Sequence, residues 1–261
     1  MTELLLDQVS RTFPARQGHA PTRALEPTDL KVGNNDFVTI LGPSGCGKST
    51  LLRIIAGLDR PTSGHVALDG REITGPGADR GMVFQSYTLF PWLTVRDNIA
   101  FGLRERGISE AERGTIADGF IQRVGLSGFE NHWPKQLSGG MQQRTAIARA
   151  LANDPKILLL DEPFGALDNQ TRMLMQEMLL GIWERDQKTV LFVTHDIEEA
   201  IFLGSRIIVM SARPGRIKAE ITVDLPHPRS YRIKTTPEFV GLKERLVEEI
   251  RVEALKVAVD G

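Results

Sequence analysis

The chain has 261 residues and a formal net charge of −1, from 32 basic and 33 acidic side chains. Hydrophobic residues make up 41% and charged residues 25%, which are values of a folded globular chain and exclude disordered and collagen-like classes. The balanced charge argues against a protein that binds nucleic acid by bulk electrostatics. The single cysteine, Cys46, excludes an intramolecular disulfide.

Wholly aliphatic runs such as Ile157–Leu160 are far shorter than the roughly 20 apolar residues of a transmembrane helix. The N-terminus carries acidic residues in place of a basic region, so we expect no signal peptide. These features predict a soluble cytoplasmic protein.

Strands and helices alternate along most of the chain. Short apolar runs predict strands at Leu4–Val9, Asp36–Leu41, His65–Leu68, Gly81–Phe84, Ile157–Leu160, Thr189–Thr194 and Arg206–Met210. Helical spacing predicts helices at Ser49–Gly57, Val95–Leu103, Glu110–Val124, Gly140–Ala152, Asn169–Glu184 and Ile197–Leu203. Such alternation is typical of an α/β fold with a mainly parallel sheet.

Three further segments have a distinct character. Pro14–Pro21 has the composition of a loop, and residues 89–153 are almost wholly helical. After Pro228, Phe239 and Leu246 fall at the spacing of an amphipathic helix packed on the core. We therefore expect a discontinuous α/β core of residues 1–88 and 154–225, a helical insert of residues 89–153, and a helical tail of residues 226–261.

A glycine-rich motif follows the strand at Asp36–Leu41 and opens the next helix. Its residues are Gly42, Pro43, Ser44, Gly45, Cys46, Gly47, Lys48 and Ser49, followed by Thr50. This is the phosphate-binding loop pattern G-x-x-x-x-G-K-[ST] in the strand–turn–helix context that it needs. Glycines let backbone N–H groups curl around a phosphate, the lysine reaches the β- and γ-phosphates, and the Ser49 hydroxyl suits Mg²⁺. Cys46 is expected to be a small packed residue without a redox role.

Two acids, Asp161 and Glu162, end the aliphatic strand Ile157–Leu160. At the carboxyl end of a parallel strand, such acids face the ligand crevice of an open α/β sheet. Asp161 would hold Mg²⁺ through water, and Glu162 would act as the general base on the attacking water.

A third motif, Leu137-Ser-Gly-Gly-Met-Gln-Gln-Arg144, places a serine and two glycines at a helix start, where N–H groups and a hydroxyl face an anion. Together with the other two motifs, in this order, it resembles the signature of ATP-binding-cassette (ABC) ATPases. The resemblance spans about Leu4 to Asp224. It implies a P-loop NTPase (RecA-like) core, an antiparallel β part at the N-terminus and an inserted helical subdomain.

The resemblance also implies roles for single residues. Gln85 matches the glutamine that links Mg²⁺ and the attacking water to the helical subdomain, and His195 matches the switch histidine at the γ-phosphate. Phe13 stands where an aromatic residue stacks on adenine, with burial in the strand's core as the alternative. The resemblance places Ser138, Gly139, Gly140, Gln142 and Asp168 across a dimer interface from the bound ATP, and makes Ser49, Gln85 and Asp161 the residues at the metal.

The family's mechanism implies partners as well. Two cassettes form a head-to-tail dimer around two ATP molecules and pass the motion to membrane permease subunits, with a solute-binding protein involved indirectly. The chain would then lie at the cytoplasmic face of the membrane, held there by the permease. The segment from Gln85 to Trp92 is a candidate contact for a permease helix, through the clustered side chains Tyr87, Leu89, Phe90 and Trp92, with burial in the local core as the alternative.

Segments such as Met210–Arg216 look most like ATPase subunits of nitrate, sulfonate and taurine importers. Methionine at position 141, glycine at 165 and phenylalanine at 13 depart from the commonest family residues. The alternatives are a non-transport ABC ATPase, an exporter subunit, or a P-loop kinase or GTPase. Non-transport ABC ATPases that act on chromosomes carry long coiled coils, and this sequence has no sustained heptads. GTPases carry an Asn-Lys-x-Asp motif, which this sequence also lacks.

Overall fold

The computed structural model describes residues 2–15, 20–86 and 88–260. The chain forms two compact units. The first combines Met1–Gly77 with Lys188–Gly261, and the second is Ala78–Gln187. The predicted boundaries of the helical insert and the tail stay a prediction.

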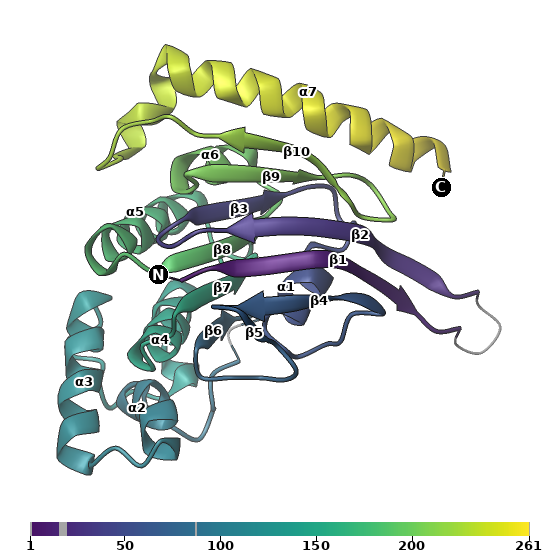
Figure 1. Cartoon of the computed structure of the whole chain (residues 1–261). Coiled ribbons are helices and arrows are strands. Elements are labelled where there is room, and N and C mark those ends of the chain that lie inside the picture. The colour runs from purple at the N-terminus through teal and green to yellow at the C-terminus, as the bar shows by residue number, and fades with distance from the viewer. Residues whose placement is uncertain (1, 16–19, 87, 261) are drawn as a thin grey trace. The chain divides into compact units, whose positions relative to one another are not determined.

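The first unit holds an antiparallel sheet in the order β2-β1-β4-β5 (Figure 1). Its strands are β1 (Leu4–Phe13), β2 (Thr22–Val32), β4 (Ser63–Leu68) and β5 (Arg71–Glu72). This sheet confirms the antiparallel part expected at the N-terminus. The sequence analysis missed β2, because Pro27 interrupts its apolar alternation; as an edge strand, β2 tolerates a proline. The loop predicted at Pro14–Pro21 lies partly outside the described residues.

The same unit holds a second group of strands in the order β10-β9-β3-β8. Strand β3 (Phe37–Leu41) pairs in parallel with β8 (Thr189–Thr194) and with β9 (Arg206–Met210). All residues of β3 and β8 are buried, as expected for parallel strands covered on both faces. The antiparallel edge strand β10 (Ile217–Thr222) was also missed by the sequence analysis.

Helices α1 (Lys48–Ile55), α6 (Ile197–Leu203) and α7 (Pro237–Asp260) complete the first unit, with a short 3₁₀ turn, η2, at Tyr231–Thr235.

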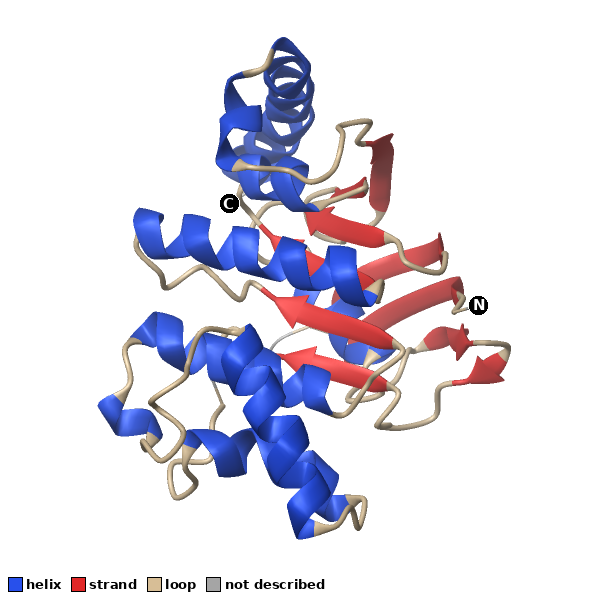
Figure 2. Cartoon of the chain, turned by 90° about the vertical axis from the view of Figure 1, so that its left-hand side faces the viewer, coloured by secondary structure: helices blue, strands red, loops and turns tan. Residues whose placement is uncertain are grey.

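The second unit pairs two parallel strands, β6 (Arg80–Val83) and β7 (Ile157–Asp161). Between them the chain forms the predicted helical insert, and a long helix follows β7; helices are blue in Figure 2. The helices are α2 (Val95–Glu105), α3 (Glu110–Arg123), η1 (Pro134–Gln136), α4 (Gly139–Ala152) and α5 (Asn169–Asp186). Side chains of Thr94, Ser109, Ser138 and Asp168 cap the four α-helices by accepting backbone N–H groups. The predicted helices and strands are confirmed, with ends shifted by a few residues.

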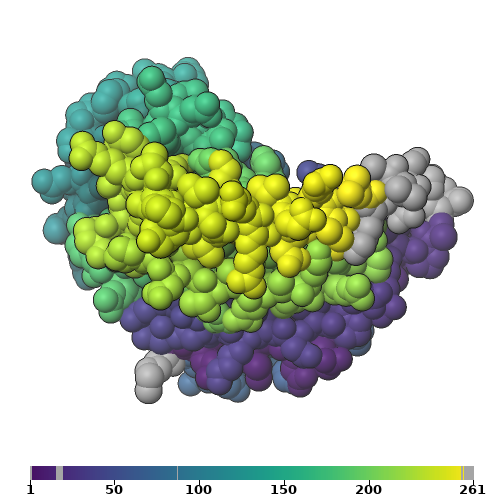
Figure 3. Space-filling view, turned by 90° about the horizontal axis from the view of Figure 1, so that it is seen from above, coloured from purple at the N-terminus to yellow at the C-terminus, as the bar shows by residue number. Residues whose placement is uncertain are grey.

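The predicted C-terminal helix is present as α7, which lies along the light-green segment of β10 (Figure 3). Phe239 and Leu246 are buried, which confirms that this amphipathic helix packs on the core of its unit. None of the helices in the described residues is long and apolar enough to cross a membrane.

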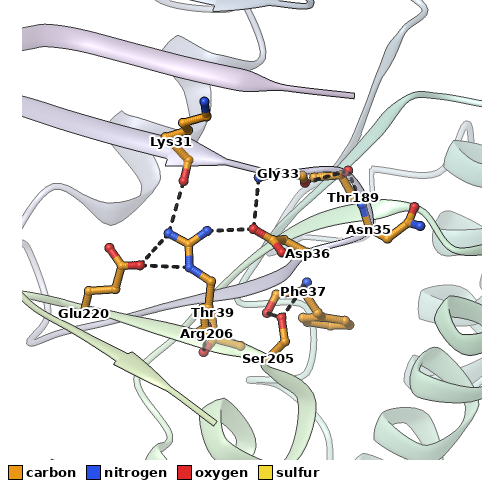
Figure 4. Close-up of polar contacts among 10 residues, drawn as sticks. All are labelled: Lys31, Gly33, Asn35, Asp36, Phe37, Thr39, Thr189, Ser205, Arg206 and Glu220. Atoms are coloured by element: carbon orange, nitrogen blue, oxygen red, sulfur yellow. Dashed lines mark hydrogen bonds and ion pairs between the residues drawn. The ribbon is translucent and has the colours of Figure 1, made fainter. Parts of the chain in front are cut away.

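A polar network fixes the edge at which β3 begins (Figure 4). The Arg206 guanidinium binds Asp36 at 2.6 Å, Glu220 at 2.6 Å and the Lys31 carbonyl at 3.1 Å. The same Asp36 carboxylate accepts the Gly33 N–H at 2.9 Å. These bonds hold β2, β3, β9 and β10 together near the N-terminal end of β3. The candidate site lies at the opposite, C-terminal end of β3.

Candidate active site

The glycine-rich loop runs from the end of β3 into α1. Gly47 precedes this helix with φ of 101°, and a Cβ there would lie 2.7 Å from Leu25 Cδ2, so a larger residue does not fit. In the part of the chain that the structure describes, no side chain caps α1 and its first turn holds no acidic residue. No acidic side chain in this turn therefore neutralises the positive end of the helix dipole, which favours binding of an anion such as phosphate.

Lys48 places its ammonium group against this loop. Its side chain is buried, and Nζ donates to the carbonyl oxygens of Gly42 at 2.8 Å and Pro43 at 3.0 Å. A buried ammonium needs such acceptors, and phosphate oxygens are stronger ones. Ser49 and Thr50 follow in the first turn and are half-buried, while Cys46 is buried.

Strand register brings His195 to the same edge of the sheet. In β3, Leu41 pairs with Thr194 of β8, so Gly42 and His195 leave neighbouring parallel strands at the same level. The His195 side chain is exposed. Just beyond it, Asp196 caps α6 by accepting the Glu199 N–H at 3.1 Å, which fixes the turn that carries the histidine.

Phe13 lies at the end of β1, opposite Thr22 of β2, and is 37% exposed. The guanidinium carbon of Arg11 lies 4.6 Å from the centroid of its ring, and Arg11 pairs with Asp59 at 2.7 Å. Phe13 is therefore not a core aromatic residue. Its stacking on adenine stays a prediction.

In the second unit, the two acids and Gln85 also meet at one edge. Val83 of β6 pairs with Leu160 of β7, so Gln85 and Asp161 follow the pair on neighbouring strands. Asp161 is 4% exposed and ends β7, whereas Gln85 is exposed. Glu162 is half-buried and has φ of 43°, a left-handed conformation that is uncommon for a residue with a side chain and concentrates at functional sites.

The signature motif forms the start of α4. Ser138 is exposed, and its Oγ accepts the Met141 N–H at 3.3 Å. A Cβ on Gly140 would lie 2.7 Å from Thr171 Cγ2, so this glycine permits the close approach of α5. Gln142 donates to the Leu137 carbonyl at 3.2 Å, and Gly139 is the first residue of the helix.

Asp168 begins α5 and accepts the N–H groups of Gln170 and Thr171 at 3.1 and 3.0 Å. A side-chain hydrogen bond with Thr171 and these backbone bonds lower the pKa of Asp168 from its usual value. The carboxylate therefore stays ionised at neutral pH, where it stabilises the helix start.

Two features of the site region were missed by the sequence analysis. In the first unit, Arg213 donates from Nε to the Gly45 carbonyl at 3.2 Å, although only its place in the segment Met210–Arg216 had been noted. In the second unit, a cavity of about 350 Å³ lies beside the end of β6, and Phe90, Phe101 and Arg149 line it. A lone arginine in a helix gives no signal of such a cavity before the fold is known.

The strand-edge loops and the glycine-rich helix start define a nucleotide-binding α/β protein, and comparison with known proteins identifies the family. The family model described as "ABC transporter" matches residues 25–165. The chain belongs to the ABC transporter family and is an ATP-binding ATPase of that family. It has the α/β fold of P-loop NTPases, as the sequence analysis predicted.

Several relatives match nearly the whole chain. An uncharacterized ABC transporter ATP-binding protein of Methanocaldococcus jannaschii is 56% identical over 234 residues, which is 90% of this chain and 86% of that one. A nitrate import ATP-binding protein of Synechocystis is 49% identical, covering 95% of each chain. A taurine import ATP-binding protein of Burkholderia thailandensis is 47% identical, covering 98% of this chain and all of that one.

Solved structures agree with the fold. A dimeric ATP-binding cassette in a post-hydrolysis state with ADP and phosphate is 38% identical, with a TM-score of 0.75. The match covers 85% of this chain and the whole of that chain.

Proposed function

We propose that this chain powers solute import by hydrolysing Mg-ATP in a head-to-tail dimer of two copies, and that it works on separate permease subunits. The observation that carries the proposal is the uncapped start of α1, with Lys48 held at the loop and a strand end carrying His195 beside it. Relatives named for nitrate, sulfonate and taurine import favour a small anion as solute. A solute-binding protein would deliver it outside the membrane.

In the first unit, Lys48 and the loop N–H groups from Gly42 to Thr50 would hold the β- and γ-phosphates. These contacts neutralise charge as the γ-phosphoryl group transfers to water, a reaction that depends mainly on positioning and electrostatics. The exposed His195 would contact the γ-phosphate, and Phe13 would stack on adenine.

In the second unit, Glu162, which follows the buried end of β7, would accept the proton of the attacking water. Gln85 would orient that water. Ser138, Gly139, Gly140, Gln142 and Asp168 would act on the ATP of the other copy, with the start of α4 facing the phosphates.

Magnesium fits the donor groups at these positions. Ser49 offers a hydroxyl, Gln85 an amide oxygen and Asp161 a carboxylate, and Mg²⁺ prefers such oxygen donors to sulfur or imidazole. No group of three or more His, Cys, Asp or Glu side chains in the described residues forms a metal cage. Mg²⁺ bound with substrate phosphates and water needs no such cage. The ion would neutralise charge on the phosphates.

The cavity in the second unit is our candidate docking site for the permease. Phe90 packs on Phe101 with ring centroids 4.3 Å apart, and Arg149 lies over the Phe90 ring at 5.3 Å. Arg149 also donates to the Thr88 carbonyl at 2.9 Å, and burial lowers the pKa of Arg149. Trp92 is 66% exposed, and its ring centroid lies 5.6 Å from that of Phe90. Tyr87 lies outside the described residues. A short helix of a permease would dock on this surface and hold the chain at the cytoplasmic face of the membrane.

Light scattering of purified Glu162→Gln, with and without saturating Mg-ATP, tests the proposed dimer. Without the general base, ATP binds but does not turn over, so we expect a shift from monomer to dimer on adding Mg-ATP. Lys48→Ala in the same background is the control and should stay monomeric. A monomer at every ATP concentration, also with co-expressed permease, would contradict the head-to-tail dimer.

Reconstitution separates transport from the alternatives. With permease subunits in vesicles, an importer's ATPase rate should rise with an anion-loaded binding protein outside. An ATPase rate that does not change when permease subunits are added would favour a non-transport ATPase. Transport of solute away from the cytoplasmic side would favour an exporter.

A further inference from the structure

The segment Ser211–Arg216, between β9 and β10, packs directly against the phosphate-binding loop. A Cβ on Gly215 would lie 1.9 Å from the Cys46 carbonyl, and one on Gly42 would lie 3.0 Å from the Met210 carbonyl. These approaches are backbone against backbone, so a shift of the segment has to shift the loop. Arg213 adds a hydrogen bond from Nε to the Gly45 carbonyl, at 3.2 Å.

Strand β2 supports the same segment from one side. The Gly215 N–H donates to the Ala24 carbonyl at 2.9 Å, and the Glu26 N–H donates to the Gly215 carbonyl at 2.8 Å. A cavity of about 520 Å³ lies along the segment, lined by Arg213 and Arg216, by Glu26 and Pro27 of β2 and by Glu253. Strand β2 thus holds the segment beside this cavity.

Helix α7 borders this cavity through Glu253, which is 1% exposed. Its Oε2 accepts the Ala212 N–H at 2.9 Å, and its Oε1 pairs with Lys218 Nζ of β10 at 3.2 Å. Lys218 also pairs with Glu249, one turn earlier on α7, at 3.0 Å. Among the side chains of α7 that the structure describes, Glu253 is the one with a hydrogen bond to the segment, whereas Glu249 pairs with Lys218.

The other end of α7 is attached near His195. Lys243 of α7 pairs with Glu198 of α6 at 2.6 Å, and Lys234 approaches the same carboxylate at 3.6 Å. A single helix is thus fixed at the element that follows the switch histidine and at the segment that supports the phosphate-binding loop.

We infer that Glu253 is a positioning residue for nucleotide binding: through the Ala212 N–H it holds the segment Ser211–Arg216, which holds the backbone of Gly45 and Cys46. This inference rests on the proposed role of the loop in binding ATP. The backbone N–H groups of such a loop cradle mainly the α- and β-phosphates, which do not react and which ADP also carries. Misplacing these groups therefore weakens nucleotide binding more than it slows the chemical step. The C-terminal helix then sets nucleotide affinity.

The test is Glu253→Ala in the full chain. We expect KM for ATP and the Kd of a fluorescent ADP to rise about fivefold to tenfold, with kcat changed less than twofold (about 1.4 kcal/mol corresponds to tenfold). Glu253→Gln keeps an oxygen for the Ala212 N–H and should restore most of the affinity. Glu249→Gln, which removes only the shared Lys218 contact, should leave Kd unchanged.

Loss of stability alone would lower the active fraction and leave Kd unchanged, and that result would overturn the inference. If Glu253→Ala does not fold, a second variant is Arg213→Ala, which removes the hydrogen bond from the segment to the Gly45 carbonyl. This variant should also raise Kd. An unchanged Kd in that variant would overturn the inference as well. If instead the loop did not bind the nucleotide, Lys48→Ala would bind it as the wild type does. That result is different from an unchanged Kd in Glu253→Ala alone.

Discussion

Arg229→Met tests how firmly the C-terminal segment is attached to its unit. The Arg229 side chain is 5% exposed, and its Nη1 donates to the carbonyls of Ile201, Phe202 and Gly204 at 3.0, 3.0 and 2.8 Å. Nη2 donates to the carbonyls of Val223 and Leu225 at 3.5 and 3.2 Å.

One cation therefore satisfies the carboxyl end of α6 and the chain that leads into the tail. Methionine fills similar volume but offers no donor, so the buried carbonyls lose their partner. Hydrogen bonds to charged groups contribute about 1.5–3 kcal/mol each, and an orphaned buried acceptor costs about 1–3 kcal/mol. Water will reach some of these carbonyls, so we expect a total loss of about 3–5 kcal/mol in the free energy of unfolding.

Urea unfolding followed by circular dichroism measures this loss. At about 2 °C per kcal/mol for a chain of this size, the midpoint of thermal unfolding should fall by about 6–10 °C. Arg232→Met is the matched control, since Arg232 is exposed three residues further on, and its variant should unfold like the wild type. A loss below about 1 kcal/mol for Arg229→Met would refute the argument that unpaired carbonyls dominate the cost.

Four further changes probe the site and its pH dependence. Lys48→Ala should lower ATP turnover at least about 10²-fold, because it removes the buried ammonium group that lies against the loop. Normal hydrolysis would contradict the phosphate-binding role of the loop. Ser138→Arg should leave nucleotide affinity of the monomer unchanged yet stop hydrolysis, since the defect acts across the dimer; surviving hydrolysis would contradict that arrangement. His195→Ala should lower turnover about 10²-fold, and an unaffected rate would make this histidine structural. A hydrogen bond and ion pair with Lys243 lower the pKa of Glu198, so this contact stabilises the fold above the ordinary Glu pKa and is lost as pH falls through the lowered value. Glu198→Gln should therefore lower the unfolding midpoint at about pH 7, and this difference from the wild type should shrink as the pH falls below the ordinary Glu pKa. A loss that does not change with pH would exclude the ion pair as the cause.

Much of the fold was predictable because its signals are local. The aliphatic runs of β3, β7 and β8 mark buried parallel strands, and the caps at Thr94, Ser109 and Ser138 mark helix starts within one turn. The edge strands β2 and β10 lack such signals, since a proline or a half-exposed pattern is tolerated where only one neighbour pairs.

The phosphate-binding loop could be predicted from the sequence, because that chemistry requires glycines, a lysine and a hydroxyl at fixed spacing on one turn of chain. The two acids at the end of a strand were also visible in the sequence. Which distant segments support that loop became visible in the folded chain alone. Arg213 meets Gly45 across 168 positions of the chain, and Glu253 meets Ala212 across 41. Such contacts are set by strand register and by the packing of α7, and they leave no periodic pattern in the residues that make them.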